Sequence, residues 1–158
     1  MRPAEPMVRN ERGMALALAL FALVVIGGIV ASNFFAGMLE QQSGRNVLFV
    51  AQAAEAAEGE LWEAMSNSPV SALRALQVGG SPLDLGVSSQ YSGVMVERTV
   101  ARLADNLFLI RSRGTRQDAA GGLLAMRAVG LLARLATDSA SGAEVLVCLD
   151  QRAWLQLY

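Results

Sequence analysis

The sequence predicts an α+β fold in which a long N-terminal helix, transmembrane in its first half and amphipathic in its second, packs on a small antiparallel β-sheet. Residues 14–39 form a run without a charged side chain, and helix-forming residues continue beyond it to Met65. After Gly79 the sequence changes to segments rich in β-branched residues with partial alternation, which is typical of strands. A chain of 158 residues leaves room for one small domain after the apolar segment.

The composition argues against several classes of function. The chain contains no His, which removes the commonest general base and the commonest metal ligand. Its formal net charge is −1, so no basic field favours nucleic acid as a partner. The sequence contains no phosphate-binding loop, nucleophile elbow, C-x-x-C pair or cluster of metal ligands. We therefore expect neither enzymatic activity nor a site for a metal or cofactor.

The apolar run at 14–39 exceeds the ~20 residues that cross a hydrocarbon core about 30 Å thick. Three arginines, Arg2, Arg9 and Arg12, precede the run, and the next is Arg45. This asymmetry predicts a cytoplasmic N-terminus and a periplasmic remainder. Three interpretations of the run remain open. It could be a secretory signal peptide that is removed, or a plain single-pass anchor. In the third interpretation, only the short leader that precedes the run is removed, and the run stays in the mature chain.

The sequence Arg12-Gly13-Met14, followed by the apolar run and by AQAAEAA at 51–57, resembles the N-terminus of type IV pilins and type II secretion pseudopilins. PilX-type minor pilins are most similar, and the resemblance covers about residues 9–65. It implies that a prepilin peptidase cuts after Gly13 and that Met14 becomes the N-methylated first residue of the mature chain. The partners it implies are the membrane, other pilin or pseudopilin subunits, the prepilin peptidase, and a pilus or secretion assembly platform.

The resemblance also implies a division of the chain into four parts. These are a prepilin leader at 1–13, a transmembrane and assembly helix at 14–39, a periplasmic continuation of that helix at 40–66, and a small α+β head at 67–158. The protein would first lie in the inner membrane as a single-pass protein with a periplasmic head. It would then join a pilus or pseudopilus fibre.

Two features inside the run bear on assembly. Most pilins carry a Glu at the fifth mature position, where it is thought to pair with the terminal amine of a neighbouring subunit, and here that position is Leu18. Leu18 cannot supply the pairing, which fits either a minor, priming or tip subunit or a degenerate motif with one more lipid-facing residue. Gly27 and Gly28 indicate either a weak point for helix packing and local melting or the ordinary abundance of Gly in transmembrane helices.

Beyond the run, the helix is expected to continue until 66–69, where polar residues and Pro provide a stop, and a short helix at 70–77 is expected to follow. The acidic residues of the long helix are expected to form a solvated face, and its last large apolar residues are expected to pack under the head. The acidic residues are Glu55, Glu58, Glu60 and Glu63, and the apolar residues are Leu61, Trp62 and Met65.

The head is expected to contain an antiparallel hairpin. Its strands lie at 91–103 and 107–113, with a turn at 104–106 between them. The Gly-rich and polar residues 114–122 are then expected to form a loop.

The segment 123–136 is ambiguous, because its composition favours a helix. PilX-type chains have a strand after a similar sequence, so we expect a strand in which Gly130 is an edge or bulge position. A further strand is expected at 144–149, where Cys148 would be a small buried side chain. The antiparallel sheet is inferred more from the resemblance than from the pattern itself.

Four arginines lie on the predicted hairpin: Arg98, Arg102, Arg111 and Arg113. They could form a basic patch for DNA or another anionic surface. Alternatively, they belong to a solvated sheet face balanced by nearby acids such as Glu97. We favour the solvated face, since the overall charge argues against nucleic acid.

Taken together, these features favour a minor pilin or pseudopilin, a structural subunit that primes or caps a type IV pilus or a type II secretion pseudopilus. The alternative is a periplasmic accessory protein with a single-pass inner-membrane anchor that never polymerises. A third possibility is a secreted soluble domain cut near Ser32, at the small-residue site Val30-Ala31-Ser32. The sequence does not decide between the two machines or identify what the head contacts.

Overall fold

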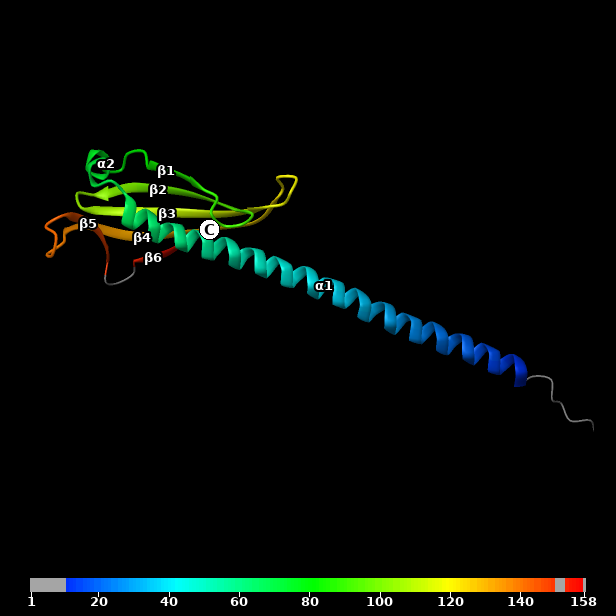
Figure 1. The fold of residues 1–158 in the computed structure, drawn as a ribbon. Coiled ribbons are helices and arrows are strands. Elements are labelled where there is room, and N and C mark those ends of the chain that lie inside the picture. The colour runs from blue at the N-terminus through cyan, green and yellow to red at the C-terminus, as the bar shows by residue number, and fades with distance from the viewer. Residues whose placement is uncertain (1–10, 150–152, 158) are drawn as a thin grey trace, which may run out of the picture. The chain divides into compact units, whose positions relative to one another are not determined.

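The computed structural model describes residues 11–149 and 153–157 (Figure 1). Most of the predicted leader, with Arg2 and Arg9, therefore lies outside the described residues. The described chain begins with helix α1 (Glu11–Asn67) and the short helix α2 (Val70–Ala75), and the strands follow. Two compact units are present, one ending at Gly44 and the other beginning at Arg45, and α1 contributes to both.

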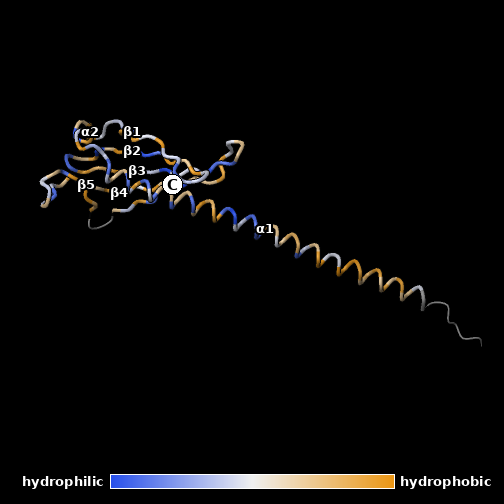
Figure 2. Tube along the Cα trace, in the orientation of Figure 1, coloured by the Kyte–Doolittle hydropathy of each residue, from blue (hydrophilic) through white to orange (hydrophobic). Residues whose placement is uncertain are grey.

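The first unit contains the N-terminal part of α1. Its residues from 13 to 44 are all exposed, and Figure 2 shows that the N-terminal part of the helix is predominantly hydrophobic. The hydroxyl of Ser32 donates a hydrogen bond to the carbonyl of Ile29 at 2.9 Å, so this polar group is satisfied within the helix. By length and composition, α1 is the one helix among the described residues that could cross a membrane. The predicted apolar helix is confirmed and is compatible with a membrane anchor.

The second unit contains one antiparallel sheet of six strands. In chain order the strands are β1 (Leu83–Ser88), β2 (Val94–Ala104), β3 (Leu107–Gln117), β4 (Leu123–Thr137), β5 (Glu144–Cys148) and β6 (Trp154–Leu157). Their order across the sheet is β1-β2-β3-β4-β5, and β6 also pairs with β4. The predicted α+β class and the predicted hairpin are confirmed. Strands β1 and β6, of six and four residues, are not among the predicted strands.

The second part of α1 packs on one face of the sheet, which we call the inner face. Its buried residues recur every three or four positions and so form one stripe along the helix. This stripe includes Ala53, Ala57, Leu61 and Ala64, and it meets Val100, Phe108, Ile110 and Leu131 of the sheet. The alanines keep the helix backbone close to the strands, so the core is thin and is formed largely by the sheet side chains.

The strand at 123–136 is confirmed, and it is more central than predicted. Strand β4 pairs with β3 on one side and with both β5 and β6 on the other, so neighbouring strands satisfy its backbone. These pairings override the helix-favouring composition. The prediction that Gly130 is an edge or bulge position is wrong, because Gly130 pairs in register with both Arg111 and Leu155. A Cβ at Gly130 would come within 3.2 Å of Leu157 and 3.3 Å of Leu109.

The predicted loop at 114–122 is wrong in its first part, because β3 continues to Gln117. Gly114 faces α1, and a Cβ built on it would overlap the backbone carbonyl of Ala53. A glycine is therefore required here for close approach of two backbones, not for a turn. The remaining loop is closed by Asp118, whose carboxylate accepts hydrogen bonds from the N–H groups of Ala120 and Gly122.

We expect Gly114→Ala to destabilise the second unit by about 1–3 kcal/mol, since the methyl group can be accommodated only if the helix moves away from the sheet. The matched control is Gly44→Ala in α1, where an added Cβ meets no atom within 4 Å. This change should stabilise the helix by up to about 1 kcal/mol. Thermal unfolding of the full chain in detergent, followed by circular dichroism, measures both changes. Equal effects of the two substitutions would contradict the close approach.

Candidate functional site

The predicted assembly residues all lie on the exposed part of α1. Met14 and Leu18 are each 64% exposed, and a Cβ added to Gly27 or Gly28 would meet no atom within 4 Å. Gly13 lies near the N-terminal end of the described part of α1, next to Met14.

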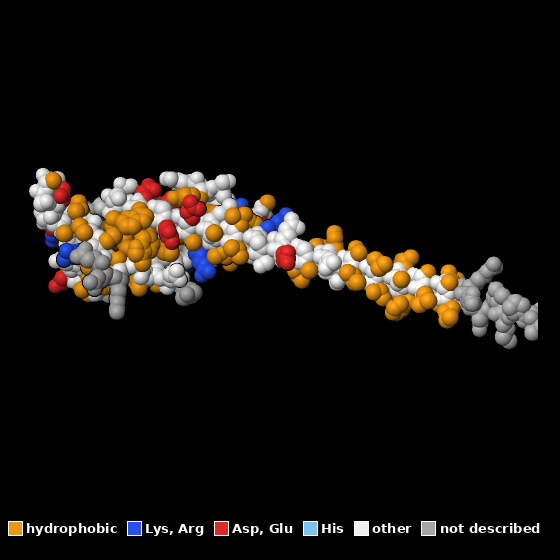
Figure 3. Space-filling model, turned by 90° about the horizontal axis from the view of Figure 1, so that it is seen from below, with side chains coloured by type: hydrophobic (Ala, Val, Ile, Leu, Met, Phe, Trp, Pro, Cys, Tyr) orange, Lys and Arg blue, Asp and Glu red, His pale blue; other side chains and the backbone are white. Residues whose placement is uncertain are grey.

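The structure places Gly27, but not Gly28, in a shallow apolar groove along the helix. The groove has a volume of about 510 Å³ and runs between Leu23 and Phe35. Because Gly27 has no side chain, the backbone of α1 is open there to another helix. Figure 3 shows hydrophobic side chains along this part of α1 on the face in view, without acidic or basic side chains among them. This surface suits lipid or other apolar helices.

A buried ion pair joins α1 to the sheet, and the sequence analysis missed it. Glu60 is 1% exposed, and its Oε2 lies 3.0 Å from Nη1 of Arg98 on β2. The hydroxyl of Ser88 on β1 donates a hydrogen bond to Oε1 of Glu60 at 2.5 Å. Arg98 also donates to the carbonyl of Leu85 at 3.3 Å. These contacts hold two strands against the helix.

The prediction that Glu60 belongs to a solvated face is wrong. Glu60 lies three positions after Ala57 and four before Ala64, which places it on the buried stripe of α1. This spacing is readable in the sequence, but the neighbouring exposed residues Glu55 and Glu58 hide it. The carboxylate is tolerated in the core because a guanidinium and a hydroxyl compensate its charge.

The four arginines of the hairpin do not form one patch. Arg98 and Arg102 lie on the inner face, whereas Arg111 and Arg113 are exposed on the opposite face, which we call the outer face. Arg102 donates to the carbonyls of Leu76 at 2.9 Å and Asp105 at 2.7 Å. These hydrogen bonds hold the segment after α2 against the sheet. Helix α2 ends at Ala75, two residues before the predicted end at residue 77. A basic patch across the whole hairpin is thus contradicted. The favoured solvated sheet face is correct only for Arg111 and Arg113, because Arg98 and Arg102 face the helices and are partly buried.

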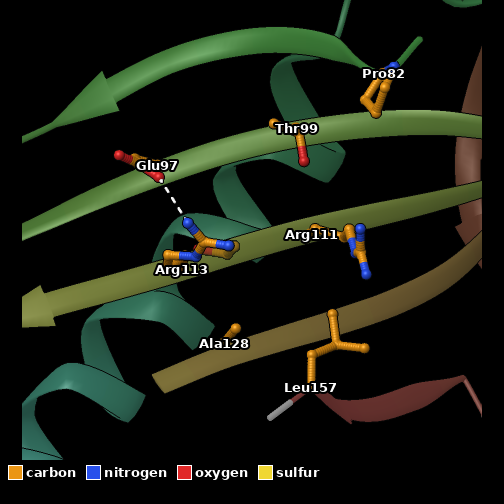
Figure 4. Close-up of a pocket in the computed structure, with 8 residues that line it drawn as sticks. Pro82, Glu97, Thr99, Arg111, Arg113, Ala128 and Leu157 are labelled. Carbon is orange, nitrogen blue, oxygen red and sulfur yellow. Dashed lines mark ion pairs between the residues drawn. The ribbon is translucent and has the colours of Figure 1, made fainter. Parts of the chain in front are cut away.

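Figure 4 shows the accessible pair in a groove on the outer face, with α1 on the far side of the sheet. Arg113 points toward Glu97 of β2, and its Nη1 lies 3.6 Å from Oε2 of that carboxylate. Both side chains are more than half exposed, so this ion pair contributes little to stability.

The tryptophans form an exposed aromatic pair. Trp62 of α1 and Trp154 of β6 pack edge to face with ring centroids 5.7 Å apart, and they remain 44% and 47% exposed. Leu61 is buried as predicted. Trp62 lies at the edge of the buried stripe of α1, where it stays partly exposed, so the prediction that it packs under the head is wrong. Cys148 is partly buried, with its Sγ 3.4 Å from the sulfur of Met65.

Two partly exposed carboxylates have shifted pKa values, and both have structural roles. A hydrogen bond from the Arg74 guanidinium lowers the pKa of Glu144, and this pair ties α2 to β5. A hydrogen bond from the Ser141 hydroxyl lowers the pKa of Asp138, which closes the turn between β4 and β5. Among the residues that the structure describes, no group of three His, Cys, Asp or Glu side chains could hold a metal ion.

No family model, curated protein or solved structure matches the chain. The resemblance to pilins therefore depends on the residues of the N-terminal segment alone.

We expect Glu60→Ala to destabilise the protein by about 3–5 kcal/mol, because it leaves the Arg98 guanidinium, whose side chain is only 18% exposed, without its partner. The control Glu58→Ala removes an exposed carboxylate two residues earlier and should change stability by no more than about 0.5 kcal/mol. The double variant Glu60→Leu/Arg98→Met should recover most of the loss, since neither charge remains. Thermal unfolding of the full chain in detergent compares the three. A double variant as unstable as Glu60→Ala would contradict this account.

Proposed function

We propose that this chain is a minor pilin or pseudopilin, a structural subunit that primes or caps a type IV pilus or a type II secretion pseudopilus. The observation that carries the proposal is the continuity of α1. One helix supplies an exposed apolar surface from residue 13 onward and, without a break, the helix of the head core up to Asn67. A subunit whose anchor is also its core helix transmits assembly of the anchors directly to the heads.

The exposed apolar part of α1 supports a mechanism of assembly in which this surface moves from lipid into contact with the helices of other subunits. Large apolar side chains along it are 42–71% exposed between Met14 and Val30, and each would be unfavourable in water. Lipid satisfies such a surface first, and a bundle of neighbouring subunit helices would replace lipid during assembly. The groove at Gly27 provides a place where a neighbouring helix backbone could approach closely. A permanently anchored accessory protein would need the apolar length but not a packing surface of this kind.

Leu18 supports a minor rather than a bulk subunit. A free terminal amine at Met14 would carry a positive charge, which is costly in an apolar bundle unless it is paired. The side chains from Met14 to Leu39 carry no charge, so the chain cannot provide a carboxylate partner for such an amine of another subunit. The first or last subunit of a fibre has a missing neighbour, and there this pairing is dispensable.

The proposed processing is tested by the mature N-terminus. In a host with an active prepilin peptidase, mass spectrometry should find the chain beginning at N-methylated Met14. In a host without the peptidase it should find intact Met1. Gly13→Val should block the cut, whereas the control Gly37→Val, also at an exposed helical glycine, should leave it unchanged. Intact Met1 beside an active peptidase would refute the pilin proposal, and a start near Asn33 would indicate a secreted domain instead.

The proposed position in the fibre is tested by restoring the family carboxylate. Leu18→Glu should let the subunit enter along the whole fibre, because the new carboxylate can pair with a neighbouring amine. The parent chain should instead label fibre ends in immunogold electron microscopy. Leu20→Glu introduces the same charge two residues later and should not spread the label. Identical labelling of the parent and Leu18→Glu would show that Leu18 does not govern position.

A further inference from the structure

The outer face of the sheet has a groove that the pilin proposal does not use. It has a volume of about 320 Å³, and its lining includes Pro82 before β1, Thr99 of β2, Ala128 of β4 and Leu157 of β6. Figure 4 shows Arg111 between these residues, at the middle of the sheet. Within residues 45–149 and 153–157, the helical segments lie on the inner side of the sheet, so the described residues of this unit leave the outer face open (Figure 1).

Arg111 is the polar group best placed to bind a ligand in the groove. It is exposed, and no acidic side chain among the described residues lies within 4.0 Å of its guanidinium. Its cross-strand neighbours are Thr99 on one side and Gly130 on the other. Both are small, so the guanidinium borders open space, and the hydroxyl of Thr99 can donate a second hydrogen bond to the same ligand.

A carboxylate is the anion that fits this arrangement. The guanidinium offers two parallel N–H groups to a carboxylate, which matches its geometry. Glu97 lines the same groove and is paired with Arg113, so the local charge is close to one positive unit. A nucleic acid strand or a phosphate-rich membrane surface would bring several negative charges against Glu97, whereas a single carboxylate meets less of this repulsion.

The surroundings of the groove indicate a protein as the source of the carboxylate. Val87, Met95, Leu103 and Met126 are 43–56% exposed and belong to the strands that form this face. Apolar surface beside one unpaired charge is typical of the centre of a protein interface. A free small acid would leave these side chains in water, while a peptide segment would cover them.

We propose that the outer-face groove binds a partner protein through one Asp or Glu side chain, which pairs with Arg111 and Thr99 while its apolar neighbours cover the surrounding sheet. The specificity is for a single carboxylate flanked by apolar residues. Glu97 limits the affinity, because it competes for the arginines and repels the incoming acid. This inference does not depend on whether the chain enters a fibre.

The test uses the full chain in zwitterionic detergent and fluorescence anisotropy. The probes are a fluorescein-labelled heptapeptide with one Glu between two Val residues, the same peptide with Gln in place of Glu, and a labelled twelve-residue oligothymidylate. We expect the Glu peptide to bind at least about tenfold more tightly than the Gln peptide, as a charge-assisted hydrogen-bonded pair requires. The oligothymidylate should bind more weakly than the Glu peptide.

Three variants assign the effect to the groove. Arg111→Gln should abolish the difference between the two peptides, whereas Arg134→Gln, an exposed arginine of β4 outside the groove, should preserve it. Glu97→Gln should strengthen binding of the Glu peptide about threefold, a gain that a purely structural role of Glu97 would not produce. Circular dichroism confirms that each variant is folded.

Several outcomes would overturn the proposal. They are equal binding of the Glu and Gln peptides, tighter binding of the oligothymidylate than of the Glu peptide, and an unchanged peptide difference in Arg111→Gln. Self-association of the chain in light scattering that Arg111→Gln abolishes would place a second copy in the groove instead of a separate partner.

Discussion

The structure of the head depends on the close approach of α1 to the sheet. Gly114 leaves no side chain between its strand and the carbonyl of Ala53, and most of the other buried residues of the helix stripe are alanines. At this separation a buried carboxylate on the helix can reach a guanidinium on β2, so Glu60 and Arg98 pair within the core. The helix therefore has one permitted rotation about its axis, because any other would bury an unpaired charge or collide with β3.

This rotation determines which surfaces remain for partners. α1 and α2 pack on the inner face of the sheet, where Arg98 and Arg102 have structural roles. The outer face keeps Arg111, Arg113 and several exposed apolar side chains. The N-terminal part of α1 is likewise exposed within its own unit. Each of the two units thus has apolar side chains that its own described residues do not cover.

The elements with strong local patterns were predictable. The apolar run, its helical continuation and the hairpin follow from composition and turn residues, and the strand at 123–136 followed from the resemblance to pilins. The short strands β1 and β6 were missed because they become strands only by pairing with β2 and β4. Gly114 was taken for a loop residue because glycine in a sequence marks a turn more often than a close contact.

The sequence by itself determined that one long helix begins apolar and ends amphipathic, because hydropathy and helix propensity are properties of neighbouring residues. It also determined the residues at the proposed processing and assembly positions, Gly13, Met14 and Leu18. Only the tertiary structure decided that Glu60 is buried and that the arginines of one hairpin divide between two faces. Both outcomes depend on which residues from distant parts of the chain meet, since burial and charge pairing arise from contacts that local sequence does not encode.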